Sequence, residues 1–592
     1  MTLKVSWCDE FVRANPLDGS VIDGDGQAMS GSRVRLASGR NEFASFQLLA
    51  GPVEKGDQVF VVPSDLKGSG GEVLSAGQFD VFVAWYLPFK ETWYPEALLP
   101  QEMVGGSTEE FRAKNAVKGQ QFAGFWVDVF VPVGTAPGAY SGGVTVKCGS
   151  KSVKLPVSLT VHAASIPDEC CMDVSLNNYA DAISMGWKDF AKDPNHMLTK
   201  KYLAAERGVW KAAHEHRMFF HYIPYTHGGY VFPGYVPETV GEGPKKKIKS
   251  WKAWDEHFGP YFDGSAFKGT RRGPVPVKRF YMPFNLAWPA DFVKFGQPGY
   301  EAEWRAVGKQ IVDHFKAKGW TKTKFDFFLN HKQRFRFFPW DGEETRFVED
   351  NDLHRYFRKL WEGTYDRKST LPVTFDYTLG TTWTYGIDIK SDFKEFIDVY
   401  IAGTFGPMWW PEETPKLHEL GRQIWSCTHS GEMTCSTRAA AFTPVQMWMR
   451  DNDGFMPVWW SLGQWSGNPW RGIWTGGDNY FYPGSEFNCT DTFPSLRLKV
   501  MRNALQMMDK FQLAAGKSAG GKDSVKAEIN ATLGCGDGDW FNKRPEFADK
   551  KLPMHWEAAD WATEEPTAVG WQKASTERYR KLRALSLKLA SK

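Results

Sequence analysis

Arg279-Phe-Tyr-Met-Pro-Phe284 begins the strand–helix–strand unit that decides the fold. A helix-forming stretch over 299–318 follows it, and the second strand is Phe325-Asp-Phe-Phe-Leu329. From about residue 170 to 515, short apolar strands alternate with amphipathic stretches, which indicates βα units around a parallel sheet. Helices are predicted near 198–216, 299–318, 351–362 and 437–450. Eight candidate strands follow this pattern: 172–176, 218–223, 279–284, 325–329, 373–377, 399–402, 423–426 and 455–460. Eight strands predict a (β/α)8 TIM barrel, in which the loops after the carboxyl ends of the strands carry the chemistry.

The segments on either side of the barrel have other patterns. Before about residue 165, alternating runs such as Phe79-Asp-Val-Phe-Val-Ala-Trp85 are separated by turn signals such as Gly68-Ser-Gly-Gly71, which predicts a β-sandwich. After about residue 515 the chain ends in a further helix near 570–590. The prediction is therefore a multidomain protein, α/β plus all-β: an N-terminal β-sandwich over 1–168, a TIM barrel over 169–515 and a short C-terminal helical appendage over 516–592.

Composition narrows the choice of partners and cofactors. The chain carries 72 Lys and Arg against 69 Asp and Glu, so no strong basic field favours nucleic acid. It contains no apolar run near the ~20 residues that a membrane helix needs. The eight cysteines lack zinc-site spacing, and no G-x-S-x-G, P-loop or G-x-G-x-x-G signature occurs. We therefore expect no metal, no organic cofactor, no nucleic acid and no membrane, while the oligomeric state stays open.

Tryptophan is unusually frequent, with 27 residues in an aromatic fraction of 15%. Flat apolar rings suit the stacking of sugar rings, whereas large aromatic cores are the alternative explanation. Trp425 and Trp448, within a strand and a helix, favour core packing. Loop positions after the sixth and eighth strands instead favour substrate platforms, which we predict at Trp410, Trp460, Trp465, Trp470 and Trp474. Asp478 and Arg471, nearby in the same loop region, are candidates to hydrogen-bond sugar hydroxyls.

Acidic residues follow the fourth strand. Asp341, Glu343 and Glu344 lie within four residues, after Asn330 and His331. Glycoside hydrolysis needs one carboxylic acid to protonate the leaving oxygen and a second group to stabilise the developing positive charge. Adjacent carboxylates suit both roles, because a neighbouring like charge raises one pKa. A solvated acidic loop is the alternative.

A second carboxylate candidate is Asp376, which we place with Tyr377 at the end of the fifth strand. Asp376 is the best single catalytic carboxylate outside the acidic loop, and Tyr377 is a candidate to bind substrate. A lone histidine at a strand end, such as His221, is more often structural than catalytic.

Three blocks of sequence near the end of the barrel resemble glycoside hydrolase family 123 and its relatives. They are Gly454-Phe-Met-Pro-Val-Trp-Trp-Ser-Leu-Gly-Gln-Trp-Ser-Gly-Asn-Pro-Trp470, Gly476-Gly-Asp-Asn-Tyr-Phe-Tyr-Pro-Gly484 and Pro494-Ser-Leu-Arg-Leu-Lys-Val-Met-Arg-Asn503. The hairpin Pro137-Gly-Ala-Tyr-Ser-Gly-Gly-Val-Thr-Val146 also resembles the end of that family's N-terminal sandwich. The resemblance implies hydrolysis of a glycosidic bond in an oligo- or polysaccharide.

The resemblance also implies roles for the acidic loop. In the family, a consecutive Asp-Glu-Pro is catalytic: the Glu protonates the leaving group, and the Asp orients the substrate's own 2-acetamido group as nucleophile. The matching residues are Glu343-Glu344-Thr345, so Glu344 would be the acid and Glu343 the orienting partner. Glu343 is one methylene longer than the family's Asp, and a displacement of a catalytic group by about 1 Å can slow the reaction ~100-fold.

Two alternatives follow from that departure. One is a catalytically decayed carbohydrate-binding protein on the same barrel. The other is a glycosidase of different mechanism that uses Asp376 with one loop carboxylate. The N-terminus has no charged start followed by an apolar stretch, so no signal peptide is evident; we expect a periplasmic or extracellular location, with a signal already removed.

Overall fold

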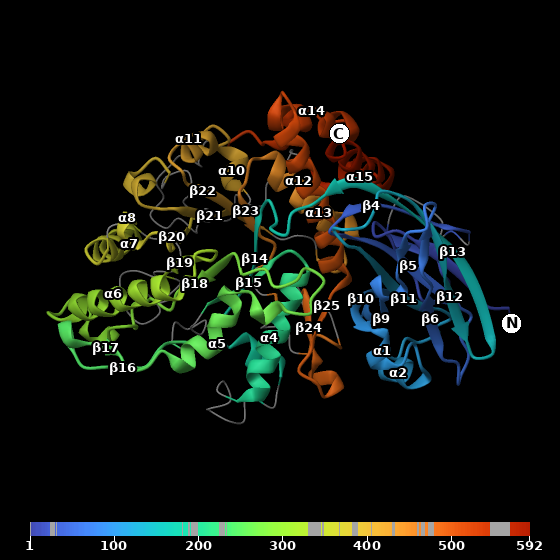
Figure 1. Cartoon of the computed structure of the whole chain (residues 1–592), viewed down its shortest axis with the longest axis horizontal. Helices are drawn as coiled ribbons and strands as arrows, with labels where there is room; N and C mark the ends of the chain where they lie inside the picture. Colours follow the sequence, from blue (N-terminus) through green and yellow to red (C-terminus); the bar gives the residue numbers. More distant parts are fainter. Residues whose placement is uncertain are drawn as a thin grey trace.

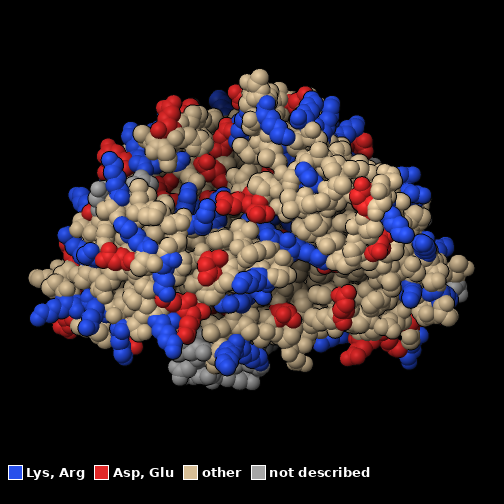
Figure 2. Space-filling view, in the orientation of Figure 1, with Lys and Arg blue, Asp and Glu red and all other residues tan. Residues whose placement is uncertain are grey.

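The structure is a computed structural model with two main bodies and one long helix packed between them (Figure 1). It describes residues 2–23, 30, 32–179, 181–187, 190, 199–223, 231, 234–329, 345, 348–365, 367–381, 389–403, 405–428, 432–458, 461–462, 468–471, 479–544 and 569–592. The blue-to-teal N-terminal part on the right of Figure 1 is a pair of sheets, and the teal-to-orange part on the left is built around a parallel sheet. On the face shown in Figure 2, basic and acidic side chains are interspersed.

Two sheets form the N-terminal body, as the alternating runs predict. The first is antiparallel, in the order β1 (Lys4–Cys8), β5 (Glu42–Gly51), β11 (Ala123–Val131), β9 (Phe79–Phe89) and β10 (Thr92–Pro100). The second has the order β4 (Val34–Arg40), β13 (Lys151–Ser165), β12 (Gly138–Cys148), β7 (Leu66–Gly68) and β8 (Val73–Leu74), with β6 (Val59–Pro63) also paired to β12. Along β13, buried and exposed residues largely alternate, because one face meets the core and the other meets solvent.

The second body is a nearly closed barrel of eight strands, all paired in parallel. Its strands match the eight sequence candidates: β14 (Asp173–Tyr179), β15 (Phe219–Ile223), β18 (Arg279–Tyr281), β19 (Lys324–Phe328), β20 (Thr374–Gly380), β21 (Val399–Gly403), β22 (Gln423–Cys427) and β23 (Gly454–Met456). The strand order closes from β14 to β23, and the described strands leave one seam without a ladder, between β15 and β18.

Helices cover the outside of the barrel. They include the four stretches predicted from periodicity, and in chain order they are α3 (Ala182–Gly186), α4 (Lys200–Glu215), α5 (Lys252–Phe262), α6 (Tyr300–Lys318), α7 (Val348–Glu362), α8 (Arg367–Thr370), α10 (Phe405–Trp409), α11 (Glu413–Glu419) and α12 (Thr437–Met449). Between β20 and β21 the described residues include a short 3-10 helix, Asp392–Glu395. Trp425 and Trp448 are buried, which confirms the core packing predicted for both.

The long helix α13 (Leu496–Lys517) lies between the barrel and the sandwich (Figure 1). Ser495 caps its first turn by accepting a hydrogen bond from the Leu498 backbone N–H. Cationic side chains on α13 pair with sandwich acids: Arg497 bonds Glu96 at 2.7 Å, and Lys499 bonds Asp128 at 2.7 Å. Because α13 covers this side, β5 and β11 are buried along their whole lengths.

Two shorter helices follow, and the second is the one that the sequence predicts near 570–590. α14 (Gly521–Leu533) and α15 (Thr576–Ala590) follow α13. α15 pairs with the start of the sandwich, where Arg580 bonds Asp9 and Arg583 bonds Glu10 at 2.6 Å. The C-terminal segment therefore contacts the N-terminal body directly. No helix of the described chain combines the length and apolarity needed to cross a membrane.

A single arginine joins five strands inside the barrel. Arg279, the first residue of β18, is fully buried. Its guanidinium bonds the carboxylates of Asp173 on β14 (2.9 Å), Asp326 on β19 and Asp376 on β20 (2.8 Å), and the amide oxygen of Gln423 on β22 (2.7 Å). The bond to Asp173 passes across the seam between β15 and β18.

Arg279→Met tests how far the barrel depends on this residue. The substitution removes the shared partner of several buried carboxylates, and breaking a buried pair typically costs about 3–5 kcal/mol. We expect the free energy of unfolding, measured by urea titration, to fall by at least that amount. The control is Arg305→Met, because the pair of Arg305 with Glu301 is 46% and 50% exposed and should contribute less than about 1 kcal/mol. Equal losses in the two variants would contradict this role for Arg279.

Candidate active site

The mouth of the barrel is formed by the carboxyl ends of its strands, where barrel enzymes carry their catalytic residues. Described residues at this rim include Tyr179 at the end of β14 and Gly380 at the end of β20. Most of the predicted site lies in the loops that follow the strands. The predicted residues outside the described part of the chain are Asn330, His331, Asp341, Glu343, Glu344, Trp460, Trp465, Trp474 and Asp478.

Thr345 is the described residue next to the predicted acids. It follows Glu344 directly in the sequence and is only 1% exposed. Its backbone N–H donates to the carbonyl oxygen of Gly380 at 3.3 Å. Because Gly380 is the last residue of β20, Thr345 lies at the carboxyl end of the fifth strand, on the rim of the barrel.

The aromatic loop after the eighth strand is anchored at the same rim. The backbone N–H of Ser461 donates to the carbonyl oxygen of Asn177 at 3.5 Å, and the Asn178 amide donates to the Ser461 hydroxyl. Tyr480, beyond the loop, donates its N–H to the Ser461 carbonyl at 3.0 Å. Both ends of the loop therefore lie beside β14. Sequence reasoning missed Asn177 and Asn178, although two consecutive amides at the end of a predicted strand are a usable signal.

Asp376 does not lie at the mouth, and this corrects the prediction made for it. It is the third of the seven residues of β20, and its carboxylate binds Arg279. Asp376 faces the barrel interior beside Asp326 of the neighbouring strand. The strand extends further than its apolar pattern suggests, to Gly380, so Asp376 is in its amino-terminal half. Its bonding partner makes it a structural carboxylate of the barrel floor.

Tyr377 also departs from its prediction. Successive residues of a strand point to opposite faces, so Tyr377 points outward when Asp376 points inward. Its hydroxyl lies 3.1 Å from Nδ1 of His354 on α7, and burial raises the pKa of the phenol. Tyr377 therefore packs the sheet against a helix instead of facing the mouth, and we withdraw it from the substrate-binding set.

Two of the predicted tryptophan platforms are buried. Trp470 is 2% exposed, its indole N–H donates to the carbonyl oxygen of Pro483 at 3.0 Å, and its ring lies 5.1 Å from that of Trp85 in the sandwich. Trp410 is 5% exposed and is covered by the Arg544 guanidinium 5.6 Å from its ring. Neither ring offers a face to a sugar, so core packing accounts for both.

A Ser–His–Asp arrangement lies below the mouth but is closed to substrate. Nδ1 of His221 is 3.1 Å from the Ser175 hydroxyl, and Nε2 is 3.3 Å from the Asp326 carboxylate. All three side chains are fully buried. Burial, with the positive charge of Arg279, holds the pKa of His221 well below its usual value, so the ring is neutral. Burial raises the pKa of Asp326 to about 6. These residues pack the barrel core.

Metal-ligating groups do not converge at the described part of the mouth. In the described ranges, one group of His, Cys, Asp or Glu side chains is close enough to share an ion: Cys170, Cys171 and Asp509. Cys170 and Cys171 precede β14, so the group lies at the opposite end of the barrel. The described mouth residues supply hydroxyls, amides and backbone groups, which suit binding of polar, uncharged ligands.

Comparison with known proteins shows the fold. No family model matches the sequence, and no curated protein matches it. Among solved structures, a family 123 glycoside hydrolase from Clostridium perfringens, described for glycolipid glycan hydrolysis, superposes with a TM-score of 0.62 at 14% identity. The match covers 100% of this chain and 97% of that one. The chain therefore has the fold of that glycoside hydrolase over its whole length.

Another solved structure matches more weakly. The β-glucuronidase of Parabacteroides merdae superposes with a TM-score of 0.27 at 8% identity, over 84% of this chain and 54% of that one. A TM-score this low does not indicate a shared overall fold.

Asp326→Asn tests the electrostatics of the barrel core. Burial lifts the pKa of Asp326 from near 3.8 to about 6, so the folded protein binds this proton more tightly than the unfolded chain does. The resulting stabilisation is complete below about pH 4 and is lost as the pH rises to about 6, at up to about 1.4 kcal/mol per pKa unit. We expect urea titrations at several pH values to show this fall in the wild type and not in the variant. Parallel curves across that pH range would contradict it.

Trp470→Ala distinguishes core packing from sugar stacking. Removal of a buried Trp typically costs about 3–5 kcal/mol, so we expect a loss of that size in the free energy of unfolding. Trp93→Ala is the control, because Trp93 is half-buried on β10 and should cost less. Glycan affinity, measured by calorimetric titration, should stay unchanged in both variants. Weaker glycan binding with unchanged stability would return Trp470 to the substrate site.

Proposed function

We propose that this chain is a glycoside hydrolase that acts on an oligo- or polysaccharide. The observation that carries the proposal is the full-length likeness of fold to a family 123 glycoside hydrolase. It is joined by the sequence blocks at 454–470, 476–484 and 494–503 that resemble the same family. A fold alone does not define a reaction, so the proposal also depends on the residues at the mouth.

Glu344 is the proposed general acid, which protonates the leaving glycosidic oxygen. The position of Thr345 supports this assignment, because the residue directly after Glu344 is buried at the carboxyl end of β20. Glu343 is the proposed orienting partner, which would hold the substrate's 2-acetamido group as the nucleophile. Asp341 adds a third negative charge to the loop, and like charges nearby favour the protonated form of one member.

The proposed substrate cleft combines aromatic and polar side chains from several loops. Trp460, Trp465 and Trp474 would stack on sugar rings, while Asp478 would hydrogen-bond hydroxyls. Asn330 and His331 would contact the sugar beside the acid. This chemistry needs neither a metal nor an organic cofactor. We place the reaction in the periplasm or outside the cell, where polysaccharides and glycolipid glycans are met.

A carbohydrate-binding protein without catalytic activity is the second candidate. Its specific support is Glu343-Glu344-Thr345 in place of the family's Asp-Glu-Pro. The extra methylene of Glu343 shifts its carboxylate by about 1 Å, which is enough to slow a positioned reaction ~100-fold. Such a protein would bind glycans through the same aromatic cleft and release no product.

Glu344→Gln is the decisive variant. The amide keeps the shape of the side chain and cannot deliver a proton, so we expect kcat to fall by about 10²–10⁴-fold on whichever glycan the wild type cleaves. The assay is the release of reducing ends from a panel of N-acetylated, neutral and sulfated glycans. Asp352→Asn is the matched control, because that carboxylate is close in sequence but 80% exposed on α7.

The outcomes separate the two candidates. A loss below about tenfold in Glu344→Gln would contradict the assignment of the acid. Glycan binding by the wild type with no hydrolysis across the panel would favour the binding protein. Hydrolysis of only the N-acetylated glycans would support the role of Glu343, because a neutral sugar carries no acetamido group to orient.

A further inference from the structure

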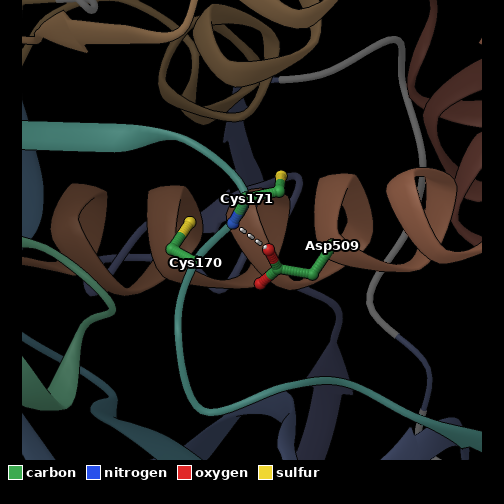
Figure 3. A group of neighbouring side chains, drawn as sticks. All are labelled: Cys170, Cys171 and Asp509. Carbon is green, nitrogen blue, oxygen red and sulfur yellow. Dashed lines mark hydrogen bonds between the residues drawn. The ribbon is translucent and has the colours of Figure 1, made fainter. Parts of the chain in front are cut away.

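Two adjacent cysteines lie in the segment that connects the sandwich to the barrel. Cys170 and Cys171 fall between the end of β13 at Ser165 and the start of β14 at Asp173. Figure 3 shows both beside α13, which carries Asp509. The two sulfur atoms and a carboxylate oxygen of Asp509 all lie within 4.8 Å of one another. Cys170 is 5% exposed, and Cys171 is half-buried.

The surroundings of this dithiol are cationic. Arg217 binds the Asp509 carboxylate at 2.8 Å, and the other carboxylate oxygen accepts the backbone N–H of Cys171 at 2.7 Å (dashed in Figure 3). Lys278 donates to the Cys170 carbonyl oxygen at 3.2 Å. Asp509 is therefore already neutralised by a guanidinium. A divalent cation here would meet resident positive charges, whereas a thiolate would be stabilised by them.

A small cavity adjoins Cys170. It has a volume of about 20 Å³, and its lining includes Cys170, His214, Arg217, Arg272 and Lys278. A volume of this size holds about one water-sized molecule. Cationic side chains share its wall with apolar ones such as Trp210 and Phe267, and a small oxidant in this space would lie against the Cys170 sulfur.

The two thiols differ in acidity. The hydrogen bond from the Cys171 thiol lowers the pKa of Cys170, and the nearby Arg217 acts in the same direction. The same hydrogen bond and burial raise the pKa of Cys171 well above its usual value. The pair therefore consists of one thiol that ionises more easily and one neighbour that stays protonated. This division suits an attacking sulfur beside a resolving sulfur.

We propose that Cys170 and Cys171 form a peroxide-reactive dithiol, which oxidises reversibly to a disulfide between adjacent residues. The oxidant is hydrogen peroxide. In the first step the Cys170 thiolate attacks one peroxide oxygen: an S–O bond forms, the O–O bond breaks, and the departing hydroxide takes a proton and leaves as water. In the second step the Cys171 thiol attacks the Cys170 sulfenic acid: the S–S bond forms, the S–O bond breaks, and the departing hydroxide takes the thiol proton and leaves as a second water.

Adjacency makes the oxidised form easy to reduce. Consecutive Cα atoms are about 3.8 Å apart, whereas disulfides usually join Cα atoms about 4.4–6.8 Å apart. The ring that closes is strained, and strain makes a disulfide more reducible. Closure also rotates the peptide between the two cysteines, whose N–H donates to Asp509 on α13 in the reduced form. Oxidation therefore acts on the contact between the connecting segment and α13.

The test is mass spectrometry of the full-length protein after treatment with a slight excess of hydrogen peroxide. The tryptic peptide over 155–188 contains Cys170 and Cys171 as its only cysteines. We expect this peptide to lose two hydrogen atoms and to regain them with dithiothreitol. Cys148, buried in the sandwich core, is the internal control and should stay a free thiol.

Two serine variants separate the steps. Cys171→Ser should stop at the Cys170 sulfenic acid, which dimedone traps, and Cys170→Ser should react no faster than Cys148. Thermal melts of both variants before oxidation establish that they are folded. Unchanged free thiols at both positions in the folded wild type would overturn the proposal. So would stoichiometric zinc in the purified wild type that is lost in either variant, because the pair would then be a metal site.

Discussion

One buried cation holds the barrel together where the backbone does not. The described strands leave a seam between β15 and β18, so hydrogen bonds between neighbouring strands do not close the ring there. Arg279 sits beside that seam and bonds Asp173 on the far side as well as Asp326 and Asp376 on the near side. An arginine suits this position because its planar fork serves several acceptors at once and stays charged when buried. The floor of the barrel is consequently ionic.

Much of the fold could be predicted from the sequence, because strand and helix periodicity is local. All eight barrel strands and the four named helices follow from runs of a few residues. The roles of single residues were harder to predict, because they depend on partners that are distant in the sequence. The local sequence does not tell whether Asp376 lies near the amino or the carboxyl end of its strand, and its partner Arg279 is 97 residues away. Tyr377 points away from the barrel interior because it is one residue further along the strand than Asp376, which points inward.

The tryptophans show the same limit. Trp470 lies among Gly, Pro and Ser residues that supply no local core, which favoured an exposed platform. Its core is supplied by Trp85, from a strand of the other body 385 residues earlier. Trp425 and Trp448 were predicted correctly because each lies within a strand or helix that packs on another element: Trp425 lies beside Phe219 of β15, and Trp448 beside Phe511 of α13. The candidate acids Glu343 and Glu344 remain a prediction from sequence, and Thr345 is their nearest described neighbour in the chain.

The row of charges along α13 has a consequence for how this protein can be divided. Arg497 and Lys499 are almost fully buried, and their partners, Glu96 and Asp128, belong to the sandwich. A barrel separated from its sandwich would present these cations on a face otherwise built for burial. A fragment that held the barrel alone would lose the carboxylate partners of these cations and expose the face of α13 that packs on the sandwich, so we expect it to be less stable than the full chain. The sandwich therefore completes the burial of α13, a helix that packs on the barrel as well.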